Sequence, residues 1–197
     1  LVLTNAVEFW DSFPYDIYNM DFCGTCFPDN QPPFSETFKA IEKIIDQHVN
    51  NNHFPFVVFL TMKALDSQTN VEAKRQLKDN IESNRLNTTL SSQINTLIPN
   101  TDAFVRDNYV DFITVSIPKI ICHLANTKNC ELEVKARAKY ERSNAKDGKY
   151  YITKFVFTFT RKGQRTLSIA GANYIKNVQN IMRLDNVKII SKSSVKL

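Results

Sequence analysis

The spacing of apolar residues changes several times along the chain, and each change predicts a different element. Residues 15–22 form a short, nearly continuous apolar run, which is typical of a strand covered on both faces, and residues 55–61 are the strongest strand signal in the chain. Between them, apolar residues recur at helical spacing from Ser35, a good N-cap, to about Val49. A strand, a helix and a strand joined by short connections predict a βαβ unit with parallel strands.

The middle of the chain predicts helices. Residues 71–85, 90–97 and 110–125 carry apolar residues at helical spacing. Pro118 lies inside the last of these stretches, and we expect a kink or a division of the helix there because proline has no backbone N–H to donate.

The last third predicts strands. Residues 132–142 and 151–160 alternate between apolar and polar positions on either side of a turn signal, Asp147-Gly148, which predicts a long antiparallel hairpin. The remaining expected elements are a helix over about residues 5–12, a helix over about 168–183 and a strand over 187–191.

These elements together predict an α/β fold, built as a mixed, mostly parallel sheet with helices on both faces and a C-terminal antiparallel hairpin. No repeat or linker divides the sequence, so we expect one domain over residues 1–197. The longest apolar run, residues 54–60, is far shorter than the roughly 18 residues of a membrane span, and no secretory signal is visible. We therefore expect a cytoplasmic protein without membrane contact.

Charge is unevenly distributed along the 197 residues. The net charge of +5 combines −6 over residues 1–70 (three basic, nine acidic) with +11 over residues 71–197 (22 basic, eleven acidic). A strongly basic segment favours a phosphate-bearing partner, although a solvated surface has the same composition.

The cysteines and histidines give no clear catalytic or metal motif. Cys23 and Cys26 have the C-x-x-C spacing of redox and zinc sites, and Cys122 and Cys130 are a loose match to a second ligand pair. Buried reduced thiols are the simpler interpretation, and we predict no metal site. Among the histidines, we expect His48 on a helix surface and His53 in a loop, with no metal spacing between them.

The order of elements and the stretch NAVEFWDSFPYDIYNMDFCG, residues 5–24, resemble the C-terminal part of a class I S-adenosylmethionine-dependent methyltransferase domain of the Rossmann-like kind. In that fold a parallel sheet ends with one antiparallel strand delivered by a hairpin. The resemblance covers residues 1–65 by pattern and the hairpin by topology. It implies a methyltransferase-like domain or fragment that acts on or binds nucleic acid, with S-adenosylmethionine as cofactor.

The resemblance also implies roles for two residues. Asn5 stands where the family often has an acid that contacts the adenine of the cofactor. Asp21 stands at the end of a strand, where amino-methyltransferases hold the target amine, and it is the candidate catalytic residue. The two prolines that follow in the family's motif are absent after Asp21.

The glycine-rich turn of the family's cofactor site is also missing, since only Gly24 precedes Gly148. We therefore expect the domain to lack its N-terminal cofactor-binding half, to be inactive alone, and to need that segment or another protein as partner.

The basic hairpin suggests a function of a different class. Lys135, Arg137 and Lys139 fall on one face of a strand with strict period-two alternation. Lys149 and Tyr151 lie on the return strand, where an aromatic ring can stack on an unpaired base. These five residues are the predicted nucleic-acid-binding set. The alternative function is a non-enzymatic subunit of a larger assembly that binds nucleic acid or protein through this hairpin.

Overall fold

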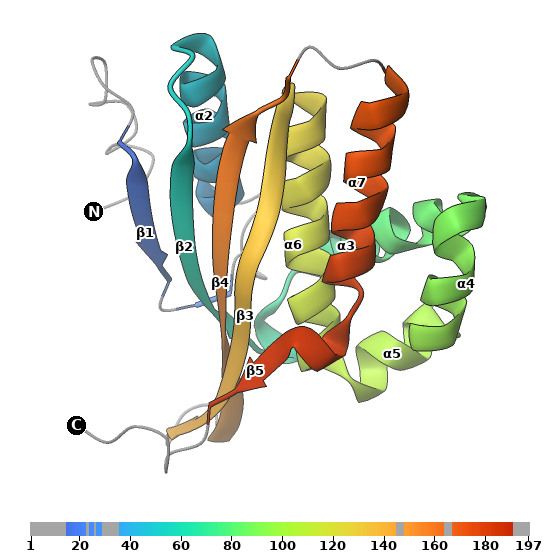
Figure 1. The fold of residues 1–197 in the computed structure, drawn as a ribbon. Coiled ribbons are helices and arrows are strands. Elements are labelled where there is room, and N and C mark those ends of the chain that lie inside the picture. The colour runs from blue at the N-terminus through green and yellow to red at the C-terminus, as the bar shows by residue number, and fades with distance from the viewer. Residues whose placement is uncertain are drawn as a thin grey trace.

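The computed structural model describes residues 15–22, 24–25, 27–28, 36–144, 148–163 and 167–190, and its core is a five-stranded sheet in the order β1-β2-β4-β3-β5 (Figure 1). Strand β1 pairs in parallel with β2, β4 pairs antiparallel with both β2 and β3, and β5 pairs in parallel with β3. Four strands therefore run in one direction and β4 alone runs in the other. The strands are β1 (Ile17–Asp21), β2 (Phe56–Ala64), β3 (Cys130–Asn144), β4 (Gly148–Arg161) and β5 (Val187–Ile189).

This topology confirms the α/β class, the mixed and mostly parallel sheet, and the C-terminal hairpin β3–β4. The predicted βαβ unit is β1, α2 and β2. The helices of the described residues are α2 (Glu36–Asn50), α3 (Val71–Glu82), α4 (Thr88–Leu97), α5 (Thr101–Asp107), α6 (Tyr109–Thr127) and α7 (Leu167–Ile181), with 3-10 turns η1 (Asp66–Gln68), η2 (Ser83–Leu86) and η3 (Leu184–Asn186).

The expectation of helices on both faces is not met in the described residues. Helices α2, α6 and α7 cover one face of the sheet, and α3, α4 and α5 lie outside α6 and α7 (Figure 1). In β2, Phe56, Val58 and Leu60 are buried against this helical layer, whereas Phe59, which points to the other face, is 41% exposed. The apolar run that contains β1 suggested two covered faces because an apolar residue, Ile17, also occupies one of its exposed positions. We call the uncovered side the open face.

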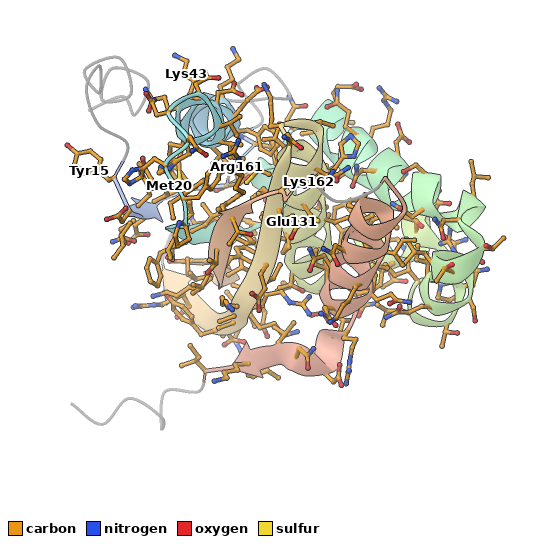
Figure 2. All side chains as sticks on the ribbon, turned by 45° about the horizontal axis from the view of Figure 1, so that its top comes forward. Tyr15, Met20, Lys43, Glu131, Arg161 and Lys162 are labelled. Carbon is orange, nitrogen blue, oxygen red and sulfur yellow. The ribbon has the colours of Figure 1, made fainter. Side chains whose placement is uncertain are left out.

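The edge strand β1 shows the same division. Its burial alternates residue by residue, so that Tyr18 and Met20 face the helices while Ile17 and Asp21 face away from them. Met20 lies inside the molecule in Figure 2, and Tyr15 projects from the sheet edge.

A β-bulge divides strand β3. The register passes from Val134 opposite Phe157 to Ala136 opposite Val156, which leaves Lys135 as the extra residue. Because one inserted residue reverses the alternation, Leu132 faces the helices before the bulge and Arg137 faces them after it. The second half of β3 therefore turns its predicted polar face inward and its small and aromatic residues outward.

Helix α6 continues through Pro118 without the division expected there. A proline at this position removes the N–H that would bond the carbonyl of Thr114, four residues earlier. The guanidinium of Arg137 replaces that donor, since its Nη1 donates to the Thr114 carbonyl over 3.2 Å. A side chain from the sheet thus satisfies the backbone group that proline leaves without a partner.

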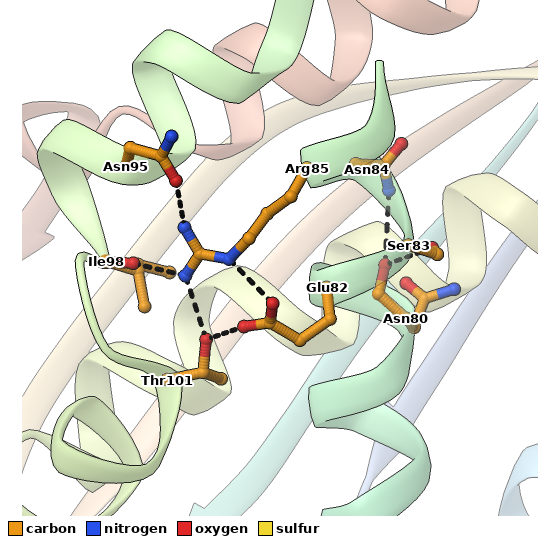
Figure 3. A network of polar contacts seen from close by, with 8 residues as sticks. All are labelled: Asn80, Glu82, Ser83, Asn84, Arg85, Asn95, Ile98 and Thr101. Carbon is orange, nitrogen blue, oxygen red and sulfur yellow. Dashed lines mark hydrogen bonds and ion pairs between the residues drawn. The ribbon is translucent and has the colours of Figure 1, made fainter.

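The outer helices are joined by a polar network (Figure 3). Arg85 of η2 donates to Glu82, Asn95, the Ile98 carbonyl and Thr101, and the Thr101 hydroxyl donates to Glu82. Burial alone would raise the pKa of Glu82, but the hydrogen bonds from Thr101 and Arg85 outweigh it, and the pKa is lowered. The charged network fixes the loop between α4 and α5 against the end of α3.

Candidate functional site

Asp21 lies at the rim of a polar hollow of about 320 Å³ on the open face, where β1 and β2 reach their carboxyl ends. Ligands of open α/β sheets bind at such strand ends. We call this hollow the open-face pocket. It is lined by Asp21, Phe22, Thr61, Lys63, Tyr140, Arg142, Tyr150, Ile152 and Lys154.

The strand register assembles this lining from four strands. Asp21 pairs with Thr61, and Thr61 pairs with Lys154 on the next strand, so the three residues form one row across the sheet. A second row places Lys63 beside Ile152, which in turn lies opposite Tyr140. Side chains in a row of paired residues share one face, and these rows share the open face.

Two tyrosines and three cations interact within the pocket. The Lys63 Nζ lies 4.5 Å from the centre of the Tyr150 ring. The Arg142 guanidinium and the Lys154 Nζ lie 5.5 Å and 5.6 Å from the centre of the Tyr140 ring. These are cation–π distances, so each ring has a positive group beside it.

The charge of the pocket is positive. Three cations face one carboxylate, that of Asp21, which gives a local net charge of +2. In the part of the chain that the structure describes, neither Arg142 nor Lys154 forms an ion pair with a carboxylate. Arg142 and Lys154 therefore remain available to an anionic ligand.

The predicted set Lys135, Arg137 and Lys139 does not share an exposed face, because of the bulge. Lys135 is exposed but pairs with Glu133 over 2.6 Å. Lys139 turns toward α6 and pairs with Asp111. These three residues therefore do not form a common surface for nucleic-acid contact.

Arg137 is buried, with 3% of its surface exposed, and its placement corrects the prediction of a nucleic-acid contact. Besides Thr114, its guanidinium donates to the carbonyls of Asn180 and Ile181 near the end of α7 and to that of Arg183 just beyond it. Desolvation lowers the pKa of Arg137 to about 10, although the nearby carboxylate of Asp185 opposes the shift. The positive charge of Arg137 is favourable beside the C-terminal end of α7, where the helix dipole is negative.

The other two members of the predicted set also lie outside the pocket. Lys149 is exposed and pairs with Glu141 over 3.2 Å. Tyr151 faces the helical side, where it packs against the core, and its neighbour Tyr150 faces the open-face pocket instead. The basic residues Arg161 and Lys162 lie at the opposite end of the hairpin, near Glu131 (Figure 2).

Sequence reasoning missed Lys63, Tyr140 and Arg142 as site residues. Lys63 is a single charged residue in a mostly apolar strand. In a strand without a bulge, Tyr140 and Arg142 would lie on the same face as the buried Leu132. The bulge places Tyr140 and Arg142 on the open face, because the positions of β3 beyond it change face, but nothing in the sequence at Lys135 signals a bulge.

Asn5, Cys23 and Cys26 lie outside the described residues. The other two cysteines are described and are buried. Burial raises the pKa of Cys122 and that of Cys130 to about 12, so both thiols are protonated and poor metal ligands. No group of three or more histidine, cysteine, aspartate or glutamate side chains is arranged to hold a metal within the described ranges.

His48 is buried, in contrast to the expected surface position. Its ring stacks on Phe56 with centroids 3.7 Å apart, its Nδ1 lies 2.6 Å from the His53 carbonyl, and its Nε2 lies 2.9 Å from the Tyr18 hydroxyl. A carbonyl only accepts, so Nδ1 carries the proton and Tyr18 donates to Nε2. Desolvation lowers the pKa of His48, and the neutral ring is a structural element of the core.

The cofactor implied by the resemblance does not fit the open-face pocket. S-adenosylmethionine carries a sulfonium cation, and the three cations of the pocket would repel it. The role of Asp21 in methyl transfer stays a prediction.

The fold and the pocket define an α/β protein with a one-sided sheet and a basic, aromatic hollow on its open face. The chain belongs to the PP_RS20740-like family, whose model matches residues 5–197. None of the curated proteins and none of the solved structures compared with it matches this chain. Within the described part of the chain, no helix combines the length and the hydropathy needed to cross a bilayer.

Proposed function

We propose that this protein binds single-stranded nucleic acid through the open-face pocket. The observation that carries the proposal is the pairing of Tyr140 and Tyr150 with Lys63, Arg142 and Lys154 in one hollow. Non-specific single-strand sites combine aromatic rings, on which bases stack, with cations that follow the phosphates. The pocket brings both groups within the span of one or two nucleotides.

The open face beyond the pocket favours a nucleic-acid strand, rather than an isolated phosphate, as the ligand. Phe59 and Val156 continue the open face away from the pocket, and Phe59 is one of the exposed large apolar residues. A sheet face with exposed aromatic and aliphatic side chains offers flat surface to unstacked bases, whereas a duplex hides its bases. No catalytic step is part of this proposal, which corresponds to the non-enzymatic alternative.

The test is fluorescence anisotropy with a labelled oligothymidylate of about 12 nucleotides, which is within the usual site size of such proteins. Two phosphate contacts, from Arg142 and Lys154, predict a log–log salt slope of about −1.4, at about −0.7 for each contact to a single strand. We expect Lys154→Gln to weaken binding and to make the slope shallower by about 0.7. Tyr140→Ala should weaken binding about fivefold or more without changing the slope, because stacking releases no counterions.

Lys135→Gln is the matched control, since Lys135 is an exposed lysine of the same hairpin that already pairs with Glu133. Its affinity and slope should match those of the unaltered protein. Equal losses in Lys135→Gln and Lys154→Gln would show that net charge alone drives binding. Absence of binding at about 50 mM salt, where such contacts are strong, would rule out the proposal.

A further inference from the structure

A second site lies on the far side of the helical layer from the open face. Helices α2, α3 and α6 enclose a groove of about 580 Å³, which we call the three-helix groove. Its floor is apolar, formed by Phe38, Ile120 and Leu124. The polar residues that line it are Glu42, Gln76, Asp79, Asn80, His123 and Thr127.

The groove offers acceptors and no cationic side chain among its described lining. Glu42 and Asp79 place two carboxylates at its edge, one from α2 and one from α3. Each carboxylate already has a partner, Lys128 for Glu42 and Arg75 for Asp79. The first pair is half-buried and the second is exposed, and a single ion pair leaves other oxygen lone pairs of each carboxylate available.

Gln76 supplies an independent observation. Its Nε2 donates to Glu72 over 3.1 Å, and a carboxylate accepts only, so the orientation of the amide is fixed. The remaining atom, Oε1, is buried and has no hydrogen-bond partner among the described residues. A buried acceptor without a donor is costly, and a ligand that brings an N–H removes that cost.

We infer that the three-helix groove binds a small organic cation, a protonated amine carried on an apolar body. The ammonium group would donate to Gln76 Oε1 and lie near the carboxylates of Glu42 and Asp79, while the apolar body would cover Phe38, Ile120 and Leu124. An anionic ligand of the same shape meets two carboxylates and an unpartnered carbonyl oxygen, and is excluded. This site is separate from the open-face pocket and does not depend on the proposed nucleic-acid binding.

One positive group lies behind the groove. Lys119 of α6 is buried, and its Nζ donates to the backbone carbonyl and the side-chain oxygen of Asn80. Both Asn80 oxygens accept from Lys119, so the acceptors left for a ligand in the groove are Gln76 Oε1 and the carboxylates of Glu42 and Asp79.

The probes are phenethylamine, 3-phenylpropionate and 2-phenylethanol, which share an aromatic body and differ in the charge of the polar end. Binding to the full chain is followed by amide chemical shifts in two-dimensional NMR. We expect phenethylamine to shift amides of α3 and α6 in a saturable way, the alcohol to bind more weakly, and the anion not to bind. Equal binding of all three, or no saturable shift with phenethylamine, would overturn the inference.

Gln76→Leu is the decisive variant because it separates ligand binding from folding. It removes the unpartnered oxygen, so thermal stability should stay the same or rise, while phenethylamine affinity falls. Asp79→Asn should weaken the amine about two- to fivefold, which is the usual worth of an exposed charge pair, and Glu133→Gln on the sheet should have no effect. Unchanged amine affinity in Gln76→Leu would show that the acceptor takes no part in binding.

Discussion

The Arg137 guanidinium donates to the Ile181 carbonyl over 2.5 Å, and this contact ties the middle of the sheet to the last residue of α7. The same guanidinium bonds the Thr114 carbonyl of α6. A single side chain therefore connects strand β3 with both helices that pack on it. This function is structural, and it explains why a charged residue is tolerated with almost no exposed surface.

Replacing Arg137 with methionine should strongly destabilise the protein. The variant removes the Arg137 donor from four carbonyls. Those of Asn180 and Arg183 keep a backbone N–H donor, but those of Thr114 and Ile181 lose this bond, and a buried group left without its partner costs about 1–3 kcal/mol. We expect a loss of at least about 3 kcal/mol in the free energy of unfolding, measured by urea titration. Arg142→Met on the exposed part of the same strand is the control and should change stability by about 0.5 kcal/mol or less.

Pro118 and Arg137 should be energetically coupled. In Pro118→Ala the residue regains an N–H that can bond the Thr114 carbonyl, which then depends less on Arg137. The change in the free energy of unfolding caused by Pro118→Ala should be more favourable by about 1 kcal/mol in the Arg137→Met variant than in the unaltered protein, because one hydrogen bond contributes about that much. A double-mutant cycle measures this difference. Strict additivity would mean that Arg137 does not compensate for the proline.

The regular patterns predicted most of the fold. Helical and alternating spacing predicted the βαβ unit, the helices α3, α4 and α6 and the long hairpin, because local periodicity reports which side of an element is buried. The short helix α5 was not predicted. The second layer of helices expected on the other face is not found in the described residues, since an apolar strand has the same sequence pattern whether one or both of its faces are covered.

The candidate site was harder to predict because it depends on one inserted residue. Lys135 carries no sequence signal of a bulge, yet every side chain of β3 beyond it changes face. Arg137 thereby moves from the predicted binding surface into the core, and Tyr140 moves into the pocket. Asp21 was placed at the correct strand end by the resemblance, but its neighbours come from strands far away in the sequence.

Lys119 should make stability depend on pH above neutrality. Desolvation lowers its pKa from 10.5 to about 7, so between these values the unfolded chain binds more protons than the folded protein. The free energy of unfolding should therefore rise with pH above about 7, by at most about 1.4 kcal/mol for each pH unit. In Lys119→Met this rise should be absent.

The measurement is a set of urea titrations between about pH 6.5 and 8.5, compared for the two proteins. The buried thiols of Cys122 and Cys130 act in the opposite sense, because their raised pKa values remove stability once unfolded thiols ionise near pH 9. They are present in both proteins and cancel in the difference. Parallel curves would show that Lys119 is charged throughout this range.

Deleting Lys135 alone should preserve both the core and the open-face pocket, whereas deleting Lys135 and Ala136 together should disrupt both. Without the extra residue, Val134 is followed directly by Ala136, and regular alternation keeps Arg137 toward the helices and Tyr140 in the pocket. Without both residues, Arg137 follows Val134, so Arg137 would turn to the open face and Tyr140 toward the helices. The carbonyls of Thr114 and Ile181 would then lose the Arg137 donor. We expect the double deletion to cost about 3 kcal/mol or more, as for Arg137→Met, and to abolish oligothymidylate binding because Tyr140 leaves the pocket. Thermal unfolding and fluorescence anisotropy measure both effects, and equal losses in the single and the double deletion would contradict this account of the bulge.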